Sequence, residues 1–284
     1  MKRLSIAAAL IGLLGTACAS GAASLGPVPS GPSESASPSG SPSSTSTRTT
    51  TPVPTVSRSI TYQVWFVRGG KLFATRRTVP ATPAIGRAAL SAVLAGPSDP
   101  ERAAGVRTAV PSGTRLLGLE IHDGIAFVDF STEFRGTGAI APILFGQVVW
   151  TIGQFSTVDR VVIKVDGAET TDVPQTKDEY ERFLPAIVVF SPVIGSAVSN
   201  PVTISGTANV FEATVSLRIL DQNGSEVARG FTQATCGTGC RGDYSALLSY
   251  QVDHEQPGTI EVFENSAKDG SPINVQRIPV TLTA

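Results

Sequence analysis

Residues 186–284 consist almost entirely of short runs in which apolar and polar residues alternate, as in "ATVSLRILD", and turn-forming clusters separate the runs. Alternation with a period of two is typical of half-buried strands, and Asn223-Gly224 predicts a tight hairpin. Seven such runs at this spacing predict an all-β sandwich of the immunoglobulin type. An antibody-type core is excluded, because the segment lacks tryptophan and its two cysteines are too close in sequence to bridge two sheets.

Residues 59–173 have a mixed pattern instead. "ITYQVWFVRGGKLFATRRTV" predicts two strands around a turn at Gly69-Gly70. "TPAIGRAALSAVLAGPS" predicts a helix, with Thr82 as its cap, Pro83 at its first helical position and a stop at Gly96-Pro97. The segment therefore starts with a hairpin followed by a helix.

The pattern then repeats. "TRLLGLEIHDGIAFVDFSTEF" predicts a hairpin that turns at Asp123-Gly124, and "APILFGQVVWTIGQF" is apolar on nearly all sides, which predicts a buried helix. "DRVVIKVDG" predicts a further strand that ends in a second Asp-Gly turn. The order ββα-ββα-β predicts an α+β domain with helices on one face of a sheet. We expect residues 174–185 to link two separately folded domains.

The N-terminus predicts export. Residues 1–18 begin with Lys2 and Arg3, continue with an apolar run too short to span a bilayer, and so resemble a signal peptide. The small residues before Cys18 resemble a lipobox, although Gly15 stands where leucine is usual. We expect a lipid such as palmitate on Cys18, which would anchor the protein to the outer side of the cell membrane. The alternative is cleavage near Ala19, which would release a soluble protein.

Residues 19–58 are rich in Ser, Pro, Thr and Gly and contain almost no bulky apolar residue. Such a segment cannot bury enough surface to offset its ordering entropy, so we expect a disordered tether. The whole chain has 284 residues and a formal net charge of −1, which argues against a nucleic-acid partner.

Cys236 and Cys240 lie in "TCGTGCRGDY". Outside the cytoplasm, paired cysteines usually oxidise. A zinc site would need two more ligands, and a thioredoxin-type motif has two residues between its cysteines where this chain has three. We therefore predict a local disulfide, with no metal and no cofactor.

The first domain resembles the GerMN domain of spore-germination and sporulation proteins. The resemblance rests on "TPAIGRAALSAVLAGP", "AVPSGTRLLGLEIHDGIAFVDFSTEF" and "FGQVVWTIGQFSTVDRVVIKVDG". It implies an extracytoplasmic α+β domain, related in shape to modules that assemble into rings, without established catalytic residues. Residues 186–284, through "SPVIGSAVSNPVTISGTANVFEATVSLRILDQNG", resemble the immunoglobulin-like domain that often follows a GerMN domain in bacterial germination proteins.

A few polar residues could carry chemistry. Two acidic side chains among Glu120, Asp123, Asp129 and Glu133 could serve a glycosidase, but turn and strand-end roles explain them as well. His122 and His254 could act as bases, but no "GxSxG" motif accompanies them, and we expect both on the surface.

Two further features allow two interpretations each. Phe211 is either a core residue, which we favour, or an exposed contact. The loop at residues 263–271 is either a hydrogen-bonded turn, which we favour, or a ligand site.

Three functions from different classes follow. The favoured one is a membrane-anchored, non-enzymatic protein that binds or scaffolds other components of the cell envelope, with envelope proteins or peptidoglycan as partners and a homo-oligomer also compatible. The second is a lipoprotein that binds peptidoglycan or another carbohydrate, which an exposed aromatic row would favour. The third is a cell-wall hydrolase, which would need a cleft lined by carboxylates.

Overall fold

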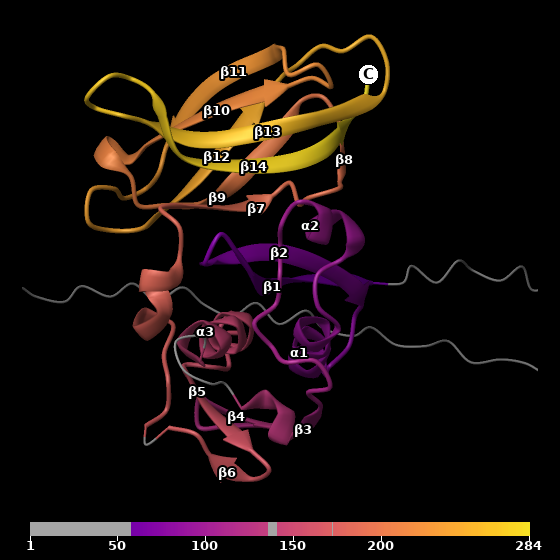
Figure 1. The fold of residues 1–284 in the computed structure, drawn as a ribbon, viewed down its shortest axis with the longest axis vertical. Helices are drawn as coiled ribbons and strands as arrows, with labels where there is room; N and C mark the ends of the chain where they lie inside the picture. The colour runs from indigo at the N-terminus through magenta and orange to yellow at the C-terminus, as the bar shows by residue number, and fades with distance from the viewer. Residues whose placement is uncertain (1–57, 136–140, 172) are drawn as a thin grey trace, which may run out of the picture. The chain divides into compact units, whose positions relative to one another are not determined.

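The first domain begins with a hairpin whose turn requires positive φ angles. In the computed structural model, which describes residues 58–135, 141–171 and 173–284, β1 (Ser59–Arg68) pairs antiparallel with β2 (Lys71–Pro80) (Figure 1). Gly69 and Gly70 have φ angles of 58° and 76°, which suit a two-residue turn between twisted strands. The predicted hairpin is confirmed.

Two helices follow, α1 (Ile85–Ala95) and the short α2 (Asp99–Ala103). The predictions that Thr82 caps α1 and that Pro83 is its first residue were wrong, because α1 begins only after Ala84. The hydroxyl of Thr82 instead accepts a hydrogen bond from the Ala84 N–H at 3.1 Å, so Thr82 closes a local turn before the helix starts. The predicted end is confirmed, since Gly96 follows the helix with a φ of 81°.

The domain's main sheet has four strands in the order β3-β4-β5-β6. Strands β4 and β5 run parallel, and the chain crosses between them through α3 (Ala141–Ile152); the other neighbours are antiparallel. Both predicted Asp-Gly turns are present, one between β3 and β4 and one between β5 and β6. The strands span Leu116–His122, Ile125–Phe130, Arg160–Val165 and Ala168–Glu169.

Helices α1 and α3 lie between this sheet and the first hairpin (Figure 1). Both helices contact β1 on one side, while α1 contacts β3 and α3 contacts β5 on the other. The apolar side chains of Leu90, Val93, Leu144 and Val148 are fully buried between the layers. The α+β class is confirmed, and the structure adds that β1 and β2 form a separate two-stranded sheet.

The second domain contains all seven predicted strands in two sheets, with the orders β11-β10-β13-β14-β8 and β12-β9-β7. The sequence missed β8 (Ala197–Val198), which has two residues and runs parallel to β14. The other strands span Ile187–Ser191 (β7), Val202–Ala208 (β9), Thr214–Leu220 (β10), Glu226–Gln233 (β11), Gly242–Leu248 (β12), Gln256–Asn265 (β13) and Pro272–Leu282 (β14).

The segment at residues 174–185 contains a 3-10 helix, η3 (Asp178–Phe183), which packs against α3. Two further 3-10 turns are η1 (Thr132–Phe134) and η4 (Phe211–Ala213). Leu184, at the end of the linking segment, is buried in one cluster with Trp65 of β1 and Val188 of β7. Apolar side chains from both domains thus share a core, and separate folding of the two domains remains a prediction.

Candidate interaction surfaces

The predicted signal peptide, the lipidation site Cys18 and the tether up to residue 57 lie outside the described residues. Among the residues that the structure does describe, no helix has the length and apolar character needed to cross a bilayer. The candidate sites within the described residues are the cysteine loop, the two histidines, the acidic residues and the surfaces of the two domains.

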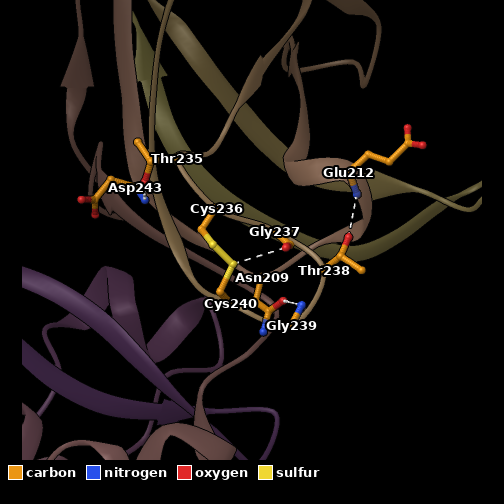
Figure 2. Close-up of a disulfide and its surroundings, with 9 residues drawn as sticks. All are labelled: Asn209, Glu212, Thr235, Cys236, Gly237, Thr238, Gly239, Cys240 and Asp243. Carbon is orange, nitrogen blue, oxygen red and sulfur yellow. Dashed lines mark hydrogen bonds between the residues drawn. A yellow bond between two sulfur atoms is a disulfide. The ribbon is translucent and has the colours of Figure 1, made fainter. Parts of the chain in front are cut away.

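Cys236 and Cys240 are joined by a disulfide, with their Cα atoms 5.7 Å apart (Figure 2). The glycines between them are needed for different reasons. Gly239 has a φ of 104°, and a Cβ atom on Gly237 would lie 2.5 Å from the Cα of Ala213. Because the bridge closes a short loop, we expect it to contribute only about 2 kcal/mol to stability.

The loop is also tied to its neighbours by hydrogen bonds (Figure 2). The backbone N–H of Gly239 donates to the side chain of Asn209 at 3.0 Å, and the N–H of Glu212 donates to the hydroxyl of Thr238 at 3.0 Å. These contacts hold the loop against η4 and the end of β9. The geometry supports a structural role for the disulfide.

Arg241 follows the disulfide and was not singled out from the sequence. Its guanidinium donates to the carbonyl of Pro185 at 2.8 Å and lies 3.4 Å from the carboxylate of Glu181 in η3. Burial lowers the pKa of Arg241, while the attraction of Glu181 acts in the opposite direction. The cysteine loop thus places a cation against the segment that links the two domains.

The two histidines and the acidic residues occupy surface or turn positions. His122 is stacked on Phe127, with 4.7 Å between ring centroids, and His254 is exposed. Asp129 accepts a hydrogen bond from the Gly167 N–H at 3.0 Å, which fixes the turn before β6. Glu133 is exposed, and hydrogen bonding to Ser131 lowers its pKa. Each of these placements fits the local structural role that the sequence had suggested.

The favoured prediction that Phe211 is a core residue was wrong, because 51% of its surface is exposed. Its backbone N–H donates to the carboxylate of Glu264 at 2.8 Å, and the next two residues have φ angles of 52° and 56°. The backbone is therefore fixed while the ring points outward. At residues 263–271 the favoured turn is present, since the N–H of Ser266 donates to the carbonyl of Ser271 at 2.8 Å.

The outer edge of β1 is satisfied by side chains that follow one another along α3 and just after it. The amide of Gln154 both accepts from the N–H of Gln63 at 2.7 Å and donates to its carbonyl at 2.8 Å. The hydroxyl of Thr151 accepts from the N–H of Trp65 at 3.1 Å. Side chains thus replace a neighbouring strand, which protects this edge from pairing with another chain.

Strand β3 is the other edge of the first domain, and its environment is different. It is the terminal strand of the four-stranded sheet, and it exposes 48% of Leu117 and 40% of Ile121. Next to it lies a groove of about 460 Å³, in which Arg87 is the charged residue among an otherwise apolar and hydroxyl-bearing lining. The groove is lined by Pro83, Ala84, Ile85, Gly86, Arg87, Leu119, Ile121, Phe155, Ser156 and Thr157.

The sequence of the chain matches two known domain families. Residues 43–171 match the family described as sporulation and spore germination (Germane), and residues 186–271 match the immunoglobulin-like domain of bacterial spore germination (Gmad2). The chain therefore contains one domain of each family. In the Germane domain the open strand is β3, and in the Gmad2 domain the disulfide loop joins β11 and β12.

Among curated proteins, the chain is similar to the spore germination protein GerM of Bacillus subtilis, with 28% identity over 109 residues. The matched stretch covers 38% of this chain and 30% of GerM, so the chain spans about a third of that relative.

Two solved structures are also similar. The first GerMN domain of GerM from Bacillus subtilis shows 23% identity and a TM-score of 0.36, over 43% of this chain and 98% of that one. The tandem GerMN domains of the same protein show 16% identity and a TM-score of 0.37, over 80% and 61% of the two chains.

Proposed function

We propose that this protein is a lipoprotein on the outer side of the cell membrane that catalyses no reaction and binds an extended segment of another envelope protein along β3. The observation that carries the proposal is the contrast between the two strand edges. Side chains of α3 and of the residues just after it cover the edge of β1, whereas β3 exposes apolar side chains beside a groove.

An extended peptide that joins a sheet edge gains its affinity from backbone hydrogen bonds, and pockets for alternate side chains give specificity. The side chains of Leu119 and Ile121 point toward α1, where they approach within about 4 Å of the position that a Cβ on Gly86 would occupy. A peptide paired with β3 would place every second side chain over this groove. Because Arg87 is the cation of the groove, an apolar segment that carries one acidic residue would fit it best.

The anchor follows from the pattern that ends at Cys18, and it can be tested separately. We expect metabolic labelling with a fatty acid to mark the wild-type chain and not the Cys18→Ser variant, because only the cysteine can take the lipid. Equal labelling of both chains, or no label on the wild type, would contradict the anchor.

The binding site on β3 can be tested with a photo-crosslinking residue in place of Leu117, in the native envelope. We expect one specific adduct, mapped by mass spectrometry to a segment with alternate apolar residues, and loss of this adduct when Ile121→Lys is added. The matched control carries the crosslinker at Val173, which is also an exposed apolar position of the first domain. Equal crosslinking from both positions would refute the site. An adduct between two copies of this chain would show that β3 binds a second copy and not another envelope protein.

A further inference from the structure

The outer face of the five-stranded sheet in the Gmad2 domain has an aromatic ring where a solvent-facing sheet usually has polar side chains. Phe231 of β11 is 73% exposed. It lies directly opposite Ser216 of β10, which in turn lies opposite Phe263 of β13, so these three side chains share one face. Phe263 is buried under Arg218, whose guanidinium carbon is 5.3 Å from the ring centre, whereas Phe231 has an open ring surface.

A hollow of about 360 Å³ adjoins the ring of Phe231. Besides Phe231 it is lined by two hydroxyl groups, one amide, one guanidinium and a glycine, from Thr214, Ser216, Asn265, Arg229 and Gly230. A volume of this size lies within the usual range of small-ligand sites, which is roughly 300 to 1,000 Å³. Hydrogen-bonding groups therefore surround one flat apolar surface.

Two of these polar groups are held in place by neighbours. The side-chain N–H of Asn265 donates to the hydroxyl of Ser216 at 2.9 Å, which fixes the amide plane. Glu226 accepts two hydrogen bonds from Arg229, from Nε at 2.7 Å and from Nη2 at 2.6 Å. Within the described residues, Nη1 of Arg229 has no hydrogen-bond partner, so this nitrogen can donate to a ligand.

We infer that this hollow binds a sugar ring of a glycan chain. The apolar face of a pyranose packs on an aromatic ring, while its hydroxyl and acetamido groups need both donors and acceptors, which Arg229, Asn265 and the two hydroxyls supply. Since the charge of Arg229 is already paired with Glu226, the site suits an uncharged ligand better than an anion. The hollow lies on the solvent-facing side of the sheet beside the 73% exposed Phe231, so a polymer can continue past it.

A peptide strand is a poorer fit at this place. The neighbouring strand β12 lies close to β11: the hydroxyl of Thr232 donates to the carbonyl of Ser245 at 3.0 Å, and a Cβ on Gly230 would lie 3.2 Å from a methyl of Leu248. This edge is therefore occupied, unlike the edge of β3. The sugar site goes beyond the proposed function and depends neither on β3 nor on the anchor, so either proposal can fail alone.

The test is a calorimetric titration of the full chain with chitotetraose, whose acetamido groups can accept from Arg229, and with maltotetraose, which lacks them. We expect saturable, salt-independent binding of chitotetraose, at least about tenfold weaker in Phe231→Ala and retained in Phe231→Tyr. The matched control is Leu247→Ala, which removes another exposed apolar side chain from the adjacent strand and should leave binding unchanged; Leu247 is 67% exposed.

Three results would overturn the sugar site. The first is the absence of saturable binding up to about 10 mM, which corresponds to roughly 3 kcal/mol of binding free energy. The second is equal affinity in wild type and Phe231→Ala. The third is self-association in analytical ultracentrifugation that Phe231→Ala abolishes, because the ring would then be a contact between copies of the chain.

Discussion

Replacing Glu101 by glutamine is expected to lower the free energy of unfolding by about 3 to 5 kcal/mol, because it leaves a partly buried cation without its partner. Glu101 in α2 is only 1% exposed. Its carboxylate accepts hydrogen bonds from Arg77 at 2.6 and 2.8 Å, from the Thr75 hydroxyl at 2.6 Å and from the Ser98 N–H at 2.7 Å. These bonds join α2 to β2.

The same carboxylate makes stability depend on pH. Burial alone would raise the pKa of Glu101, but the hydrogen bonds from Arg77, Thr75 and Ser98 lower it to about 2. A pKa that is lower in the folded than in the unfolded chain stabilises the fold above the unfolded value, near 4.5, and the gain is lost as pH falls toward 2.

Urea unfolding of the wild type, Glu101→Gln and Glu169→Gln at neutral and acidic pH measures both effects. Glu169 is the matched control, because its ion pair with Lys164 is long, at 4.0 Å, and half-exposed, so its loss should cost less than about 1 kcal/mol. An equal effect of the two variants, or a Glu101→Gln chain that loses as much stability in acid as the wild type, would contradict the role of Glu101.

Gly206→Ala is expected to destabilise the Gmad2 domain by about 3 kcal/mol or more, because it overpacks a site and breaks a buried hydrogen bond. Gly206 lies in β9 between β7 and β12. Above it, the hydroxyl of Tyr244 donates to the carbonyl of Val188 at 3.0 Å. A Cβ atom on Gly206 would lie 1.9 Å from that carbonyl oxygen and 2.7 Å from the hydroxyl, so both must move.

Thermal unfolding followed by circular dichroism measures the effect. The control is Gly118→Ala in β3, where the added Cβ would lie 3.7 Å from the nearest side-chain atom, an ordinary contact. We expect Gly118→Ala to change the melting temperature little and Gly206→Ala to lower it by several degrees. If the two variants have the same melting temperature, the close approach at Gly206 does not constrain the fold.

The strands and turns of this fold were predictable from sequence because they depend on neighbouring residues. The Asp-Gly and Gly-Gly pairs fixed the hairpins through their positive φ angles, and alternation fixed the long strands of the sandwich. Strand β8 was missed because two residues are too few for a pattern, and its pairing with β14 is made by residues 84 positions apart in the register Thr281↔Ala197.

The candidate sites were less predictable, because most of them depend on contacts between residues that are distant in sequence. The disulfide was predictable from the predicted export, the short spacing of the two cysteines and the lack of further metal ligands, and the structure contains it. The outward ring of Phe211 depends on Glu264, and the contacts of Arg241 depend on Pro185, so both come from residues distant in sequence. Phe231 has the alternation of an ordinary strand residue, and only the register with Ser216 and the open side of the sheet show that its ring is free.

The hydrogen bonds that cover the edge of β1, made from α3 and from the residues just after it, also affect how the chain folds. Gln63 and Gln154 are separated by 91 positions, so the edge cannot be covered until a long stretch of chain has been ordered. Such distant pairings slow folding, because the chain loses the entropy of loop closure before the new contacts stabilise it. Until α3 packs against β1, a partly folded chain exposes the edge of this strand, which contains Trp65 and Phe66. We expect aggregation to be most rapid at this stage of folding.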